Sequence, residues 1–152
     1  MRKYNPSQLK DSIFKKIKPK RSEIYDILDK KGLRYLTQLR LDLNPLNYYK
    51  FCYEFRDTHD PMCNSNCGIE DAKHFLLDCH EFQHIRKTLM SNVSQKLNCD
   101  FSFFDSKKIF QTLLYGNKKY NKVINTYILN QTINYIYKSK RFEKKSDDDQ
   151  AI

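Results

Sequence analysis

Residues 63–79 hold three of the chain's five cysteines and one of its four histidines. Thiolate and imidazole are the ligands that a tetrahedral Zn²⁺ prefers, and two cysteines separated by three residues have the usual spacing of a ligand pair. The Asn, Ser and Gly residues around the second cysteine tolerate tight turns, which let two nearby sulfurs face one ion. The stretch predicts a zinc site, with Cys63, Cys67, His74 and Cys79 as candidate ligands.

The second half of this stretch is predicted to be helical. Glu70 and Asp71 precede an apolar run, and acidic residues stabilise the N-terminus of a helix. His74 and Cys79 are five positions apart, which is about 500° around a regular helix, so they would not share a face. We therefore expect the helix to loosen or end near Asp78, and a second helix to begin at about His80.

Two other interpretations of the same stretch stay open at this point. The first two cysteines are followed by His80 after twelve residues and by His84 after three more, which is the spacing of a two-Cys, two-His finger. Against this set, Asp71 occupies the position of the finger's core aromatic residue, and the other histidine and cysteine would be left unused. The third interpretation is that no metal binds and the cysteines are simply buried.

Apolar residues that recur every three or four positions predict helices on both sides of the cysteine-rich stretch. The predicted helices cover residues 7–18, 22–31, 33–43, 82–97, 106–115 and 118–141. Gly32 is expected to end the second of these and Gly116 the fifth. The predicted fold class is all-α: a small helical domain with a zinc-knuckle-like Cys-Cys-His-Cys loop between helices.

The aromatic run from Asn47 to Phe55 fits both a strand and a helical turn, so its periodicity does not decide between them. Its rings lie next to Lys50 and Arg56 in the sequence. They either pack into the core beside the zinc loop or stack on unpaired bases.

The length of 152 residues suits one domain with a modest core. We predict a basic N-terminal segment at residues 1–21, the helical zinc-binding domain at 22–142 and a disordered charged tail at 143–152. No window approaches the roughly 18 apolar residues of a membrane-spanning helix, and no apolar secretory core follows Met1. We therefore expect an intracellular protein, in the nucleus or cytoplasm, with reduced cysteines and no membrane partner.

The net charge of +10 is unevenly distributed. Residues 1–50 carry a net +8, residues 51–100 a net −3 and residues 101–152 a net +5. Basic flanks attract polyanions, nucleic acid first and anionic membrane second. The residues predicted to contact nucleic acid are Lys15, Lys16, Lys18, Lys20, Arg21, Arg34 and Arg40.

Four blocks of the sequence resemble a known family. They are Leu-Thr-Gln-Leu-Arg-Leu-Asp-Leu-Asn-Pro-Leu-Asn at 36–47, Asp-Pro-Met-Cys at 60–63, Gly-Ile-Glu-Asp at 68–71 and His-Phe-Leu-Leu-Asp-Cys at 74–79. The chain resembles, over roughly residues 20–140, the C-terminal zinc-binding region of non-LTR retrotransposon (LINE, jockey-like) reverse transcriptase polyproteins. It departs from that pattern at Asp42, where related sequences often have glycine, and in the three residues between Cys63 and Cys67.

The resemblance favours the ligand set Cys63, Cys67, His74 and Cys79. It implies a non-catalytic module that binds RNA or DNA without sequence specificity and helps a reverse transcriptase engage its template or target. The sequence contains neither the paired-Asp motif of a reverse transcriptase nor an endonuclease domain, so we predict no catalytic residues. Two alternatives stay open, a zinc-stabilised protein-interaction scaffold and a non-functional remnant of a mobile element.

Overall fold

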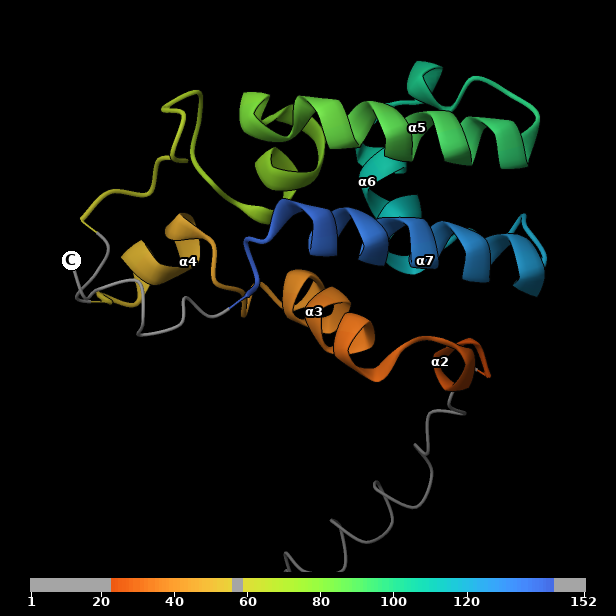
Figure 1. Cartoon of the computed structure of the whole chain (residues 1–152), viewed down its shortest axis with the longest axis horizontal. Coiled ribbons are helices and arrows are strands. Elements are labelled where there is room, and N and C mark those ends of the chain that lie inside the picture. Colours follow the sequence, from red (N-terminus) through yellow and green to blue (C-terminus); the bar gives the residue numbers. More distant parts are fainter. Residues whose placement is uncertain (1–22, 56–58, 144–152) are drawn as a thin grey trace, which may run out of the picture.

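In the computed structural model, the longest helix of the described chain, α7 (Lys122–Ser139), runs through the middle of the fold. Figure 1 shows α5 (Gln83–Leu97) along one side of α7, with α3 (Lys30–Arg40) and the short α2 (Ile24–Ile27) on the opposite side. α6 (Ser106–Tyr115) also packs against α7. α7 is therefore the helix on which the others are assembled.

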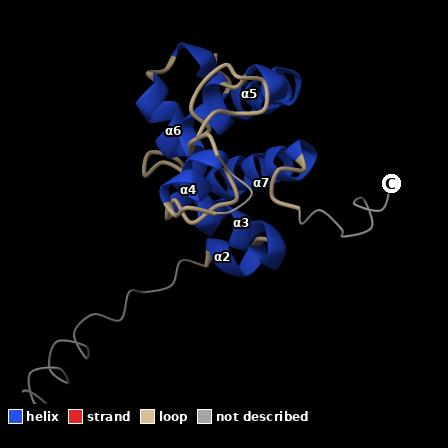
Figure 2. Cartoon of the chain, turned by 90° about the vertical axis from the view of Figure 1, so that its left-hand side faces the viewer, coloured by secondary structure: helices blue, strands red, loops and turns tan. Residues whose placement is uncertain are grey.

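Short helical segments complete the fold. They are α4 (Asn47–Cys52), η1 (His74–Asp78), η2 (His80–Phe82) and η3 (Phe101–Phe103). The structure describes residues 23–55 and 59–143, and within these residues Figure 2 shows helices and loops but no strand. The predicted all-α fold class, with the Cys-Cys-His-Cys loop between helices, is confirmed.

α7 is buried on more than one side because helices pack around it. Its buried residues are Ile128, Leu129, Thr132, Ile133, Tyr135 and Ile136. The Thr132 hydroxyl donates to the backbone carbonyl of Leu113 in α6 at 2.8 Å, which satisfies a buried polar group. The helix begins four residues later than predicted, because the Asn121 side chain accepts a hydrogen bond from the backbone N–H of Ile124 and caps it.

The start of α3 shows that the predicted role of Gly32 is wrong. Instead of ending a helix, Gly32 lies in the first turn of α3, where its N–H donates to the Asp29 carboxylate at 2.8 Å. A Cβ on Gly32 would lie 2.3 Å from Cγ2 of Ile133 in α7. Glycine is needed here because α3 and α7 approach each other closely. Sequence rules that assign glycine to helix ends do not distinguish this role from that of a helix terminator.

The connection from α3 to α4 contains a residue in the left-handed backbone conformation. Asp42 has a φ of 53°, in the left-handed region that glycine adopts without strain. The aromatic run that follows is helical over Asn47–Cys52, and none of the residues of α4 is buried. The core-packing interpretation of this run is therefore wrong for α4.

The fully buried Glu70 connects the cysteine-rich loop to the end of α7. Its carboxylate accepts hydrogen bonds from Nε of Arg141 at 2.7 Å, from Nη2 of Arg141 and from the backbone N–H of Asn47 at 2.8 Å. The side-chain amide of Asn47 in turn donates to the backbone carbonyl of Met62 at 2.7 Å. A buried carboxylate is tolerated only when it is paired and hydrogen-bonded. This one ion pair holds together α4, the loop and the end of α7.

No helix in the described part of the chain has both the length and the apolar character needed to cross a bilayer. The predicted domain limits and the predicted N-terminal helix depend on residues 1–22 and 144–152, which lie outside the described residues.

Replacing Arg141 by methionine should destabilise the fold strongly. The Glu70 carboxylate would stay buried without its counter-charge, and the free energy of unfolding should fall by about 3 kcal/mol. Urea denaturation followed by circular dichroism measures this change. The matched control is Lys122→Met, which breaks the exposed Lys122–Glu23 pair and should leave the urea midpoint almost unchanged. Equal effects of the two substitutions would contradict the structural role of the buried pair.

Candidate metal centre

The structure brings Cys63, Cys67, His74 and Cys79 together into one cluster. Their ligand atoms, the three Sγ atoms and a ring nitrogen, all lie within 4.8 Å of one another. Sγ of Cys67 is 3.4 Å from Sγ of Cys63, 4.0 Å from Sγ of Cys79 and 3.5 Å from Nε2 of His74. Two sulfurs bound to one tetrahedral zinc at about 2.3 Å would be about 3.8 Å apart. The spacing of the four side chains therefore fits a single tetrahedral ion.

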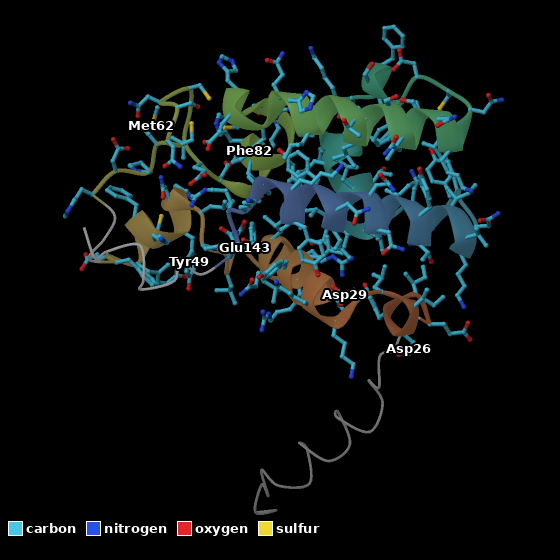
Figure 3. The ribbon with its side chains drawn as sticks, viewed as in Figure 1. Asp26, Asp29, Tyr49, Met62, Phe82 and Glu143 are labelled. Atoms are coloured by element: carbon cyan, nitrogen blue, oxygen red, sulfur yellow. The ribbon has the colours of Figure 1, made fainter. Side chains whose placement is uncertain are left out.

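A tight turn brings the first two cysteines together. Met62 and Ile69 form an antiparallel bridge, and within it the N–H of Cys63 donates to the carbonyl of Gly68 at 2.9 Å. Asn66 has a φ of 52°, a left-handed conformation that asparagine tolerates. In Figure 3 this turn, marked by Met62, lies at the end of the molecule where α5 begins near Phe82.

A wide helical turn brings the other two ligands to the same side. η1 is a single π-helical turn, in which the N–H of Cys79 donates to the carbonyl of His74 at 2.8 Å. An i to i+5 hydrogen bond closes a wider turn than that of an α-helix, so residues five positions apart come to lie above one another. The prediction that the helix loosens or ends near Asp78 is confirmed, because the π-helical turn runs from His74 to Asp78 and ends there.

Contacts with the core and with α5 hold the end of this turn in place. Phe75 and Leu76 are fully buried, and the hydroxyl of Tyr135 in α7 donates to the backbone carbonyl of Phe75 at 2.5 Å. The Arg86 guanidinium of α5 donates to the carbonyl of Cys79. Arg86 is partly buried beside the end of the ligand-bearing turn, a contact that its position in the helical pattern does not reveal.

Hydrogen bonds to sulfur and burial have opposite effects on the pKa values of the thiols. The Ser65 hydroxyl lies 3.3 Å from Sγ of Cys63 and 3.2 Å from Sγ of Cys67. Burial raises the pKa of Cys63, but hydrogen bonds from Ser65, from the backbone of Cys67 and from His74 outweigh burial and lower the pKa to about 6. Burial raises the pKa of Cys79 to about 11. Since metals bind thiolates, Cys63 already favours its ligand form at neutral pH, whereas Cys79 would release a proton on binding.

The alternative finger set is not assembled. His80 and His84 are both exposed, and neither belongs to the cluster that the described residues form. The backbone N–H of His80 donates to Sγ of Cys67 at 3.4 Å, so this residue supports a ligand without being one. The remaining cysteines, Cys52 and Cys99, are exposed and lie outside the cluster.

The two described arginines of the predicted nucleic-acid-binding set differ in their surroundings. Arg34 is exposed, with its guanidinium over the Tyr35 ring at 5.4 Å. Arg40 donates from Nε to the carbonyl of Leu114 at 2.7 Å and from Nη1 to the Tyr25 hydroxyl at 3.0 Å. These bonds tie α3 to α6 and α2, which counts against a phosphate contact by Arg40. The other predicted residues, Lys15, Lys16, Lys18, Lys20 and Arg21, lie outside the described residues.

Comparison of the chain with protein-family models, with curated proteins and with solved structures found no match.

Replacing Gly68 by alanine should weaken metal binding without unfolding the helices. A Cβ at this position would lie 2.6 Å from Cε1 and 2.7 Å from Nδ1 of His74, so the imidazole would be pushed out of line with the three sulfurs. Misplacing a ligand in this way should lower zinc affinity about 10- to 100-fold. Competition with a chromophoric chelator measures that affinity.

The control for this substitution is Asn64→Ala, an exposed position in the same turn. It should leave zinc affinity unchanged. Equal affinity of Gly68→Ala and the parent chain would show that His74 is not a ligand.

Proposed function

We propose that the chain is a non-catalytic, zinc-stabilised module that binds RNA or DNA without sequence specificity, and that it derives from the C-terminus of a retrotransposon reverse transcriptase. The observation that carries the zinc part is the convergence of three sulfurs and one imidazole nitrogen within 4.8 Å. This donor set suits zinc, whereas calcium and magnesium prefer oxygen ligands.

The four ligands support a structural rather than a catalytic role. Catalytic zinc sites usually have three protein ligands and leave the fourth position to water or substrate. Here Cys63, Cys67, His74 and Cys79 would fill a tetrahedral shell. Bound zinc would lock the turn at residues 63–67 to the π-helical turn at 74–79, and its binding free energy would contribute to folding.

The nucleic-acid part of the proposal rests on charge and on the family resemblance. The chain has a net charge of +10, and its first 50 residues carry most of this excess. Such a cluster of basic residues favours a polyanion as the partner. Lysine and arginine side chains that neutralise phosphates release the counterions of those phosphates, and this release contributes to the binding affinity. Residues 51–100, which contain the cysteine-rich loop, carry a net charge of −3. We therefore place the phosphate contacts in the basic segments on either side of the loop.

Zinc content is the first test of this proposal. Chain purified without added metal should carry one zinc per molecule, and a Cys63→Ser, Cys79→Ser double variant should carry little, as measured by atomic absorption. Chelation should lower the helical circular dichroism signal of the parent, because zinc contributes to folding. A well-folded parent chain without zinc, unable to take it up, would overturn the zinc module and leave the cysteines as core residues.

Salt dependence tests nucleic-acid binding. Affinity for a labelled RNA, followed by fluorescence anisotropy, should fall steeply with added salt. Neutralising Lys15, Lys16, Lys18, Lys20 and Arg21 together with glutamine should weaken binding and reduce the log–log salt slope by about 1 for each lost phosphate contact.

The matched control removes the same number of charges elsewhere, at the exposed residues Lys87, Lys107, Lys118, Lys119 and Lys138. It should weaken binding less than the N-terminal substitutions do. Binding that is insensitive to salt, or absent for both RNA and DNA, would remove the nucleic-acid part of the proposal and leave the protein-interaction scaffold or the remnant.

A further inference from the structure

A hollow between the end of α3 and α4 is lined by side chains that soluble proteins usually cover. Its volume is about 230 Å³, and its apolar lining includes Leu41, Leu43, Tyr48, Tyr49 and Tyr53. Leu41 is 61% exposed and Tyr53 is 64% exposed. Single apolar side chains on a surface are ordinary, but a contiguous group around one hollow marks an interaction site.

The charged groups of the hollow are both acidic. Asp42 and Asp71 line it, and no lysine or arginine of the described residues does. Within residues 23–55 and 59–143 neither carboxylate forms an ion pair. Two adjoining hollows have cationic side chains in their linings: Lys30 and Arg34 line one, and Arg40 and Lys73 line the other together with the same two aspartates. The hollow between α3 and α4 therefore presents two carboxylates without an ion pair beside its tyrosine rings, and Oδ1 of Asp71 accepts a hydrogen bond from the backbone N–H of His74 at 2.7 Å.

The carboxylates and the tyrosine rings of the hollow together favour one class of partner. The tyrosine rings alone could stack on bases, but the two carboxylates repel the phosphates of a nucleic acid. A lysine or arginine side chain would be attracted by both kinds of group in the lining. The carboxylates attract it by charge, and the tyrosine rings attract it by a cation–π interaction. Apolar neighbours of that cation would cover the exposed leucines.

We propose that the hollow between α3 and α4 is a docking site for a basic, amphipathic protein segment. A lysine or arginine of that segment lies against Asp42 and Asp71, and its apolar side chains cover Leu41 and Leu43. None of the four candidate metal ligands lines the hollow, although Asp71 contacts the backbone of one of them, His74. The proposal holds whether or not the chain binds nucleic acid.

The test uses the zinc-loaded full chain and a fluorescein-labelled peptide of about 12 residues, with leucine at every third or fourth position and arginine between. A second peptide has glutamate in place of every arginine. Anisotropy should show binding of the arginine peptide only. Asp42→Asn keeps a residue that tolerates the left-handed backbone and removes the charge, so it should weaken binding about fivefold. Asp71→Asn keeps an oxygen that can accept the backbone N–H of His74, so it should act similarly.

Two variants act as controls for these substitutions. Glu143→Gln removes an exposed carboxylate outside the hollow, and Phe103→Ser removes a ring that is 86% exposed on η3. Both should bind the arginine peptide like the parent chain, whereas Tyr53→Ser should bind it several-fold more weakly.

Cys52 lines the hollow and is exposed, so it reports where the peptide binds. In a Cys99→Ser background, bound arginine peptide should slow alkylation of Cys52 by iodoacetamide. Absence of binding by this peptide, equal binding of the glutamate peptide, unchanged affinity in both aspartate variants, or protection of Cys52 by an oligonucleotide instead would each overturn the proposal.

Discussion

The hydrogen bond from the Cys79 N–H to the His74 carbonyl is the constraint on which the metal centre depends. In an α-helix these residues would point about 140° apart, and no single ion could bind both. The π-helical turn removes that conflict by widening one turn of the helix. The core holds the wide turn in place, since Phe75 and Leu76 are fully buried and Tyr135 of α7 donates to the Phe75 carbonyl.

The C-terminal end of α7 also helps to position the turn that carries Cys63 and Cys67. Arg141, just beyond α7, pairs with the buried Glu70, and Glu70 in turn accepts the N–H of Asn47 at the start of α4. The turn that carries the first two cysteines lies between these contacts. The candidate metal cluster, α4 and the end of α7 are therefore connected through the Glu70–Arg141 ion pair. Loss of this ion pair should affect all three.

The connection gives α4 two different surroundings. Asn47 faces the loop through Met62, whereas Tyr48, Tyr49 and Tyr53 face the acidic hollow beside α3. A bound zinc would fix the position of α4 and with it the shape of that hollow. The metal would then have a structural role in presenting a surface, in agreement with four protein ligands and no open coordination position.

The sequence by itself determined the helical class, α5, α6 and the spacing of the four candidate metal ligands, because apolar periodicity and ligand chemistry are local properties. Only the tertiary structure decided between His74–Cys79 and His80–His84, since that choice depends on a turn anchored by α7. It also decided that Gly32 lies inside a helix against Ile133, that Arg40 binds Leu114 and that Glu70 is buried with Arg141. Each of these roles depends on residues distant in the sequence, and local patterns carry no information about such partners.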